Sequence, residues 1–129
     1  MLRDISTGED VKHFVDEFYG RALKDALLGP VFQERIKAED WPEHLNRIYG
    51  FWNSILLGTG EYRGSAFDKH IGLPIDGSHF KRWMDLFRET LDELFEGPVK
   101  DDTLKRAGIM AQLFESKLDR LRNDPLAIH

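Results

Sequence analysis

The sequence predicts a single all-helical domain. Over four long segments, apolar residues recur at intervals of three and four, which is the spacing of an amphipathic helix. The alternation typical of strands is scarce, and no repeat, low-complexity stretch or shift in composition marks a second domain. Because 129 residues are enough to bury one core, we expect residues 1–129 to fold as one unit.

The first helix is expected over residues 9–25. Tyr19 lies beside its apolar stripe, which consists of Val11, Phe14, Val15, Phe18 and Ala22. A Ser or Thr at positions 6–7 is placed to cap this helix, with Glu9 or Asp10 completing a capping box. Gly29-Pro30 ends the unit, and a short helical turn that carries Phe32 is expected after it.

The second helix is expected to begin at Asp40-Trp41-Pro42-Glu43 and to end at Gly58. Asp40 is placed at the cap, Pro lies in the first turn, and Glu43 is placed to reach back to the helix start. Two overlapping stripes widen its apolar face: Trp41, Leu45, Ile48, Trp52 and Ile55, and His44, Ile48, Phe51 and Ile55. Such a face is wide enough to contact both a core and a flat ligand.

From Gly58 to Gly77 the apolar residues no longer follow a helical spacing, and glycines recur. One short helical turn, over about residues 66–70, fits between these glycines. A loop of this length is normally functional or disordered. This segment also holds four apolar residues: Tyr62, Phe67, Ile71 and Leu73. We expect them to pack against a neighbouring surface, part of which would be a cofactor.

A third helix is expected from near Ser78 to Gly97, with one apolar face: Phe80, Trp83, Met84, Phe87, Leu91 and Leu94. A fourth is expected from about residue 101 to 122, with its own apolar residues in register: Leu104, Ala107, Ala111, Phe114, Leu118 and Leu121. The tail at 124–129 is expected to be frayed.

Composition argues against several classes of function. A net charge of −5 without a basic block argues against a nucleic-acid partner. The absence of cysteine excludes disulfides, thiolate nucleophiles and Cys-ligated metals, and it fits a cytoplasmic protein. No signal peptide is visible, and the longest largely apolar stretch, residues 48–58, is too short to span a membrane. The zinc motif H-E-x-x-H, a phosphate-binding glycine loop and a nucleophile elbow are all missing.

His70 is the candidate for a chemical role. It ends a short turn in which a preceding carbonyl would hold one ring nitrogen while the other binds a haem iron. A lone histidine is more often a surface or core residue, and that alternative stays open. Residues 61–82 hold four basic and three acidic side chains, a balance that suits haem propionates. A solvated charged face would have the same composition.

Tyr19 and Trp83 are candidate hydrogen-bond donors on the opposite side of such a haem. A phenol O–H and an indole N–H both need an acceptor, and a bound dioxygen would supply one. The alternatives are a core tyrosine that reaches the surface and a simple core tryptophan. His44 lies on the inner stripe of the second helix, either as a ligand contact or gate, or as a partly exposed histidine near a helix start.

The chain resembles the truncated haemoglobins, and within them the third group, from about Val11 to Leu118. The Gly-Gly pairs typical of the first two groups are absent, which favours the third. The resemblance is carried by Phe18-Tyr19, LGPVF at 28–32, W-x-x-H at 41–44, FWxxxLLGxGxYxG at 51–64, Lys69-His70 and HFxxWxxLF at 79–87.

The resemblance implies a bacterial protein with a shortened globin fold, a two-over-two helical sandwich around haem b. It implies that His70 is the proximal iron ligand, that Tyr19 and Trp83 are distal donors, and that His44 is the distal-helix histidine. The remaining expected contacts to haem are Phe32, Ile48, Phe51, Trp52 and Tyr62 in the pocket, and Arg63, Lys69 and His79 near the propionates.

Three functions follow as hypotheses. The first is redox chemistry on dioxygen or nitric oxide, such as nitric oxide dioxygenation or peroxide reduction, with an unidentified reductase. It is favoured because two donors would hold oxygen too tightly for delivery. The second is non-enzymatic oxygen storage, transport or sensing. The third is a helical interaction module that binds no haem.

Overall fold

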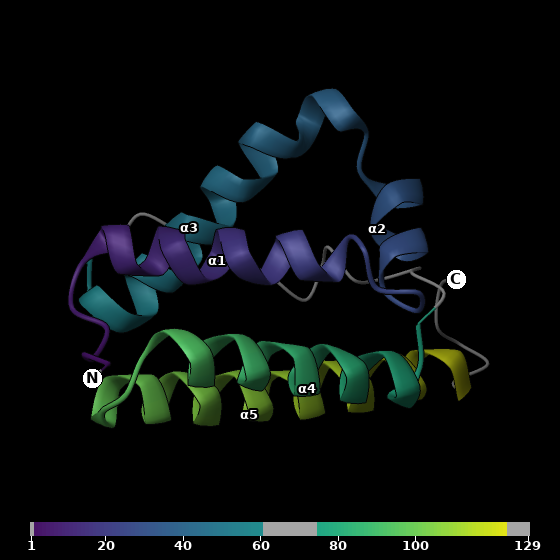
Figure 1. Ribbon diagram of the computed structural model, residues 1–129. Helices are drawn as coiled ribbons and strands as arrows, with labels where there is room; N and C mark the ends of the chain where they lie inside the picture. Colours follow the sequence, from purple (N-terminus) through teal and green to yellow (C-terminus); the bar gives the residue numbers. More distant parts are fainter. Residues whose placement is uncertain (1, 61–74, 124–129) are drawn as a thin grey trace.

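The computed structural model describes residues 2–60 and 75–123, and every regular element within these ranges is a helix. Helices α1 and α3 form one layer and α4 and α5 the other, with α2 at one end (Figure 1). This arrangement confirms the predicted two-over-two helical sandwich. The elements are α1 (Gly8–Ala22), α2 (Gly29–Arg35), the 3-10 helix η1 (Ala38–Asp40), α3 (Trp41–Leu57), α4 (Gly77–Leu94) and α5 (Pro98–Asn123).

Helix α1 begins with the predicted capping box. Thr7 is the N-cap: its hydroxyl accepts from the Asp10 N–H at 3.3 Å, and the Asp10 carboxylate accepts from the Thr7 N–H at 3.0 Å. Every residue of the predicted apolar stripe is buried, so the periodicity identified the inner face correctly. The helix ends at Ala22, three residues before the predicted end, because the chain turns there toward α2.

The turn from α1 into α2 is held by Asp25. Its carboxylate accepts from the N–H groups of Leu27 at 3.1 Å and Leu28 at 3.0 Å, and from Arg82 Nε of α4 at 2.6 Å. Burial opposes ionisation of this carboxyl, but the three donors outweigh that effect and lower its pKa. Asp25 therefore fastens the start of α2 to α4.

The start of α3 differs from the prediction. Because η1 precedes it, Asp40 has helical backbone angles and its side chain makes no capping hydrogen bond. Asp40 is nevertheless the N-cap residue of α3, as predicted. Glu43 pairs with Arg47 one turn later, at 2.6 Å, so the predicted reach of Glu43 back to the helix start is wrong. The end of α3 was predicted correctly: Gly58 stops it with a left-handed φ of 68°.

Helix α4 begins with a capping box that sequence reasoning missed. The Asp76 carboxylate accepts from the Ser78 N–H at 2.9 Å, and the Asp76 N–H donates to His79 Nδ1 at 3.1 Å. Hydrogen bonds from Ser78 and His79 lower the pKa of Asp76 to about 2. The box fixes the His79 ring at the first turn of α4, with the accepting nitrogen turned toward the backbone.

Helix α5 starts at Pro98 because the N-terminal arm caps it. The Asp4 carboxylate accepts from the N–H groups of Val99 at 2.9 Å and Lys100 at 2.8 Å. Gly97 adopts a φ of 142°, and a Cβ there would lie 2.5 Å from Asp4 Cγ, so the close approach requires glycine. Within the described ranges, no helix is long and apolar enough to cross a membrane.

Candidate functional site

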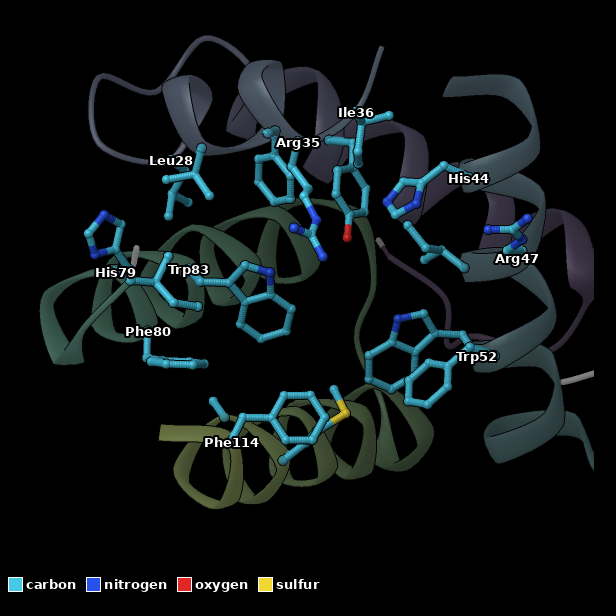
Figure 2. Close-up of a pocket in the computed structure, with 18 residues that line it drawn as sticks. Leu28, Arg35, Ile36, His44, Arg47, Trp52, His79, Phe80, Trp83 and Phe114 are labelled. Carbon is cyan, nitrogen blue, oxygen red and sulfur yellow. The ribbon is translucent and has the colours of Figure 1, made fainter. Parts of the chain in front are cut away.

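A cavity of about 330 Å³ lies between α2 and α3 on one side and α4 and α5 on the other (Figure 2). Its size is within the usual range of ligand sites, and its walls are mainly aromatic and aliphatic. The lining residues are Tyr19 from α1; Leu28, Val31, Phe32, Arg35 and Ile36 from α2 and its ends; His44, Arg47, Ile48, Phe51 and Trp52 from α3; Ile75; His79, Phe80 and Trp83 from α4; and Met110, Ala111 and Phe114 from α5.

The structure brings most of the predicted site residues to this one cavity. Those that line it are Tyr19, Phe32, His44, Ile48, Phe51, Trp52, His79 and Trp83. The other predicted site residues lie outside the described ranges: Tyr62, Arg63, Lys69 and His70. The assignment of His70 as the iron ligand therefore stays a prediction.

Tyr19 presents a neutral hydroxyl to the cavity. Burial raises the pKa of its phenol, so the group stays protonated at physiological pH. Its ring is held edge-on by Phe18 at 5.0 Å and by Phe32 at 5.5 Å between ring centres. Its hydroxyl makes no hydrogen bond to any other described residue, so it is available as a donor within the cavity.

Trp83 is the second donor at the cavity. Its indole stacks on Phe87, at 4.9 Å between centres and 8° between planes, and meets Phe18 edge-on at 5.3 Å. Its N–H has no hydrogen-bond partner in the part of the chain that the structure describes. Phe18, which is 1% exposed, therefore contacts the rings of both donors and fixes them relative to each other.

His44 lies beside Tyr19 at the same cavity. Its ring is half-buried and meets the rings of Trp41 at 5.2 Å and Tyr19 at 6.2 Å, both edge-on. This position is compatible both with a ligand contact and with a partly exposed histidine near a helix start, so the role of His44 stays a prediction. His13, by contrast, is exposed on α1.

The cavity wall combines apolar surface with positive charge. It includes the guanidinium groups of Arg35 and Arg47 and the imidazole of His79, and no aspartate or glutamate is among its described lining residues. These features fit haem, which needs an apolar slot for its macrocycle and cations or donors for its two carboxylates. Phe32, Ile48, Phe51 and Trp52 would hold the macrocycle.

Two basic residues at the cavity were missed from the sequence. Arg47 follows His44 by three residues on α3, and that spacing places both on one helix face, so the signal was present. Arg35 ends α2, a helix of seven residues, which is too short for its periodicity to indicate an inner face.

The known proteins to which this chain is similar are globins, as the arrangement of helices and cavity suggests. The family model of the bacterial-like globins matches residues 3–116. The chain is 35% identical over 113 residues to the group 3 truncated hemoglobin of Campylobacter jejuni, covering 85% of this chain and 89% of that protein. The crystal structure of the group III truncated hemoglobin from Campylobacter jejuni is similar with a TM-score of 0.84 and 32% identity, covering 100% of both chains. The chain therefore belongs to the bacterial-like globins, and within them to the group III truncated haemoglobins, which bind haem and diatomic gases.

Proposed function

We propose that this globin holds haem b in the cavity and carries out redox chemistry there, as a nitric oxide dioxygenase or a peroxide-reducing enzyme. The observation that carries the proposal is that Tyr19 and Trp83, donors from two different helices, line one cavity without a partner among the described residues. Haem, when bound, supplies the iron that takes up the gas and exchanges electrons.

The chain's own residues divide into three groups around this haem. We assign His70 as the iron ligand from its place in the family motif Lys69-His70. Arg63, Lys69 and His79 are proposed as cations or donors near the haem carboxylates because they are the basic and donor residues around that motif. His44 lies on the side of the two donors, next to Tyr19. Phe32, Ile48, Phe51, Trp52 and Tyr62 would contact the macrocycle.

The two donors retain a ligand in the cavity. A hydrogen bond to a group that carries charge contributes roughly 1.5–3 kcal/mol, and 1.4 kcal/mol corresponds to about a tenfold change in an equilibrium constant. Tyr19 and Trp83 would each slow the release of an oxygen molecule by about tenfold or more. Because such retention opposes delivery, it favours a reaction within the cavity over transport.

Ligand dissociation tests the role of the donors. We expect Tyr19→Phe and Trp83→Phe each to speed oxygen dissociation, measured by stopped flow, by about tenfold or more. Tyr49→Phe is the matched control, because Tyr49 donates to Asp16 and does not line this cavity. Dissociation rates that stay at the wild-type value in both cavity variants would reject the proposal.

Turnover separates an enzyme from a binding protein. The ferrous protein is mixed with oxygen and then with nitric oxide, in the presence of a reductase that returns the electrons. Repeated consumption of nitric oxide is the expected result. A single reaction per protein molecule would instead indicate storage, transport or sensing.

Haem binding itself is tested with haemin and the purified protein. We expect wild type to show a specific Soret band, and His70→Ala to lose it. His13→Ala is the control, because His13 is exposed on α1 and does not line the cavity. A band of equal intensity in His70→Ala would overturn the assignment of the iron ligand.

A further inference from the structure

Arg35 differs from the other basic residues at the cavity. Arg47 is paired with Glu43 at 2.6 Å, and His79 Nδ1 accepts from the Asp76 N–H in the capping box of α4. Arg35 forms no ion pair or hydrogen bond with any residue in the described ranges, although it lines the cavity. It is therefore the cation at the cavity that has no protein partner among those residues.

Most other arginines in the described ranges, unlike Arg35, have a carboxylate partner. Arginines throughout the described ranges pair with carboxylates: Arg3, Arg21, Arg47, Arg82, Arg106 and Arg122. Arg88 and Arg120 have no ion pair within 4.0 Å among the described residues, but both are exposed outside the cavity. Arg35 alone among the described arginines combines the lack of a partner with a place at the cavity.

The short helix α2 directs Arg35 inward. The side chain extends from α2 toward the cavity interior, above the space between the helices (Figure 2). Val31 and Phe32 of α2 and the C-cap residue Ile36 line the same cavity with apolar surface. Next to such surface an ion pair is stronger than in bulk water, and a guanidinium offers a planar fork of N–H donors that matches a carboxylate.

We propose that Arg35 is the anion-binding residue of this cavity and pairs, through its guanidinium, with a carboxylate or similar monoanion held there. The inference rests on the proposed function, because it assumes that haem occupies the cavity. The anion has two sources: a carboxylate of the haem macrocycle, or a small monoanion such as nitrite that enters beside it. Arg35 is exposed at the cavity mouth, so the pairing is screened by salt.

Two measurements on the haem-loaded protein distinguish these sources. The first is the rate of haem transfer to an excess of a haem-free globin acceptor, at low and high salt. The second is a spectral titration of the ferric protein with azide as the anionic probe and imidazole as the neutral probe. The variants are Arg35→Gln, which removes the charge, and Arg35→Lys, which keeps the charge but loses the fork. Arg88→Gln is the control, since Arg88 is exposed outside the cavity.

If Arg35 binds the macrocycle, Arg35→Gln speeds haem transfer by about three- to tenfold at low salt and leaves azide affinity unchanged. If it binds a small anion, azide affinity falls by about the same factor while imidazole affinity and haem transfer stay unchanged. Arg35→Lys is expected to lie between wild type and Arg35→Gln.

Values within about twofold of Arg88→Gln in both measurements would overturn the proposal for Arg35 while leaving the proposed function intact. Failure of the proposed function is recognised separately, because wild type would then show no Soret band that depends on His70. That result would overturn both proposals.

Discussion

Replacing Phe18 with leucine tests whether one buried ring positions both cavity donors. Phe18 is 1% exposed and meets the rings of Tyr19 at 5.0 Å, Trp83 at 5.3 Å and Phe87 at 5.4 Å. An aromatic pair contributes roughly 0.5–1.5 kcal/mol beyond its buried area. Leucine keeps most of the apolar burial but loses all three pairs, so we expect Phe18→Leu to lower the free energy of unfolding by about 2 kcal/mol.

Phe14 offers a matched control one turn earlier on α1. It is also fully buried, and its ring meets those of Trp52 at 5.9 Å, Phe87 at 5.9 Å and Phe95 at 6.5 Å, but no contact with Tyr19 or Trp83 is seen in the described structure. Phe14→Leu should therefore cost a similar free energy of unfolding without moving either donor.

The assay combines urea unfolding with stopped-flow dissociation of oxygen from the haem-loaded proteins. Both variants are expected to lose about 2 kcal/mol, whereas Phe18→Leu alone is expected to speed dissociation, by about three- to tenfold. Because the free energy of unfolding falls in both variants, a difference between their dissociation rates reports the position of the donors rather than a loss of stability. Equal dissociation rates in Phe18→Leu and Phe14→Leu would refute the idea that Phe18 aligns the donors.

Three further predictions concern the framework around the cavity. Asp25→Ala removes the acceptor for two backbone N–H groups and should cost about 1–2 kcal/mol in thermal unfolding, far more than Asp85→Ala at an exposed ion pair. Gly29→Ala places a methyl group 2.5 Å from the Leu23 carbonyl oxygen, so its melting temperature should fall by several degrees; an unchanged value would show that α2 shifts freely. The pKa of Asp10 is lowered by its hydrogen bond to Arg3, against burial, and by backbone N–H groups. Its contribution to stability is therefore present at neutral pH and is lost as pH falls below about 4, toward the folded pKa; urea midpoints of Asp10→Asn should depend less on pH in that range.

Much of the fold was readable from local patterns. The stripe on α1, the capping box at Thr7 and the stop at Gly58 all depend on residues within a few positions of one another. Residue type alone suggested Tyr19 and Trp83 as a pair of donors, because both need an acceptor, but only the family resemblance related two helices so far apart in the chain.

The features that were missed have one of two causes. Some join distant parts of the chain, as in the contact of Asp25 with Arg82, for which no spacing rule exists. Others depend on small differences in free energy between alternative capping arrangements at a helix start. At Asp40 the preceding 3-10 turn leaves the N-cap side chain without a capping hydrogen bond, and at Asp76 a histidine takes the place that glutamate usually has in a capping box.

The cap on α5 has a consequence for how the molecule is made. Asp4 and the Val99 N–H that donates to it are 95 positions apart, so during synthesis the carboxylate leaves the ribosome long before its donors exist. Helix α5 carries Met110 and Phe114, which line the cavity. A nascent chain that stops before α5 therefore lacks both the contact to Asp4 and this wall of the cavity, and a pocket able to enclose a macrocycle arises only after α5 has been synthesised.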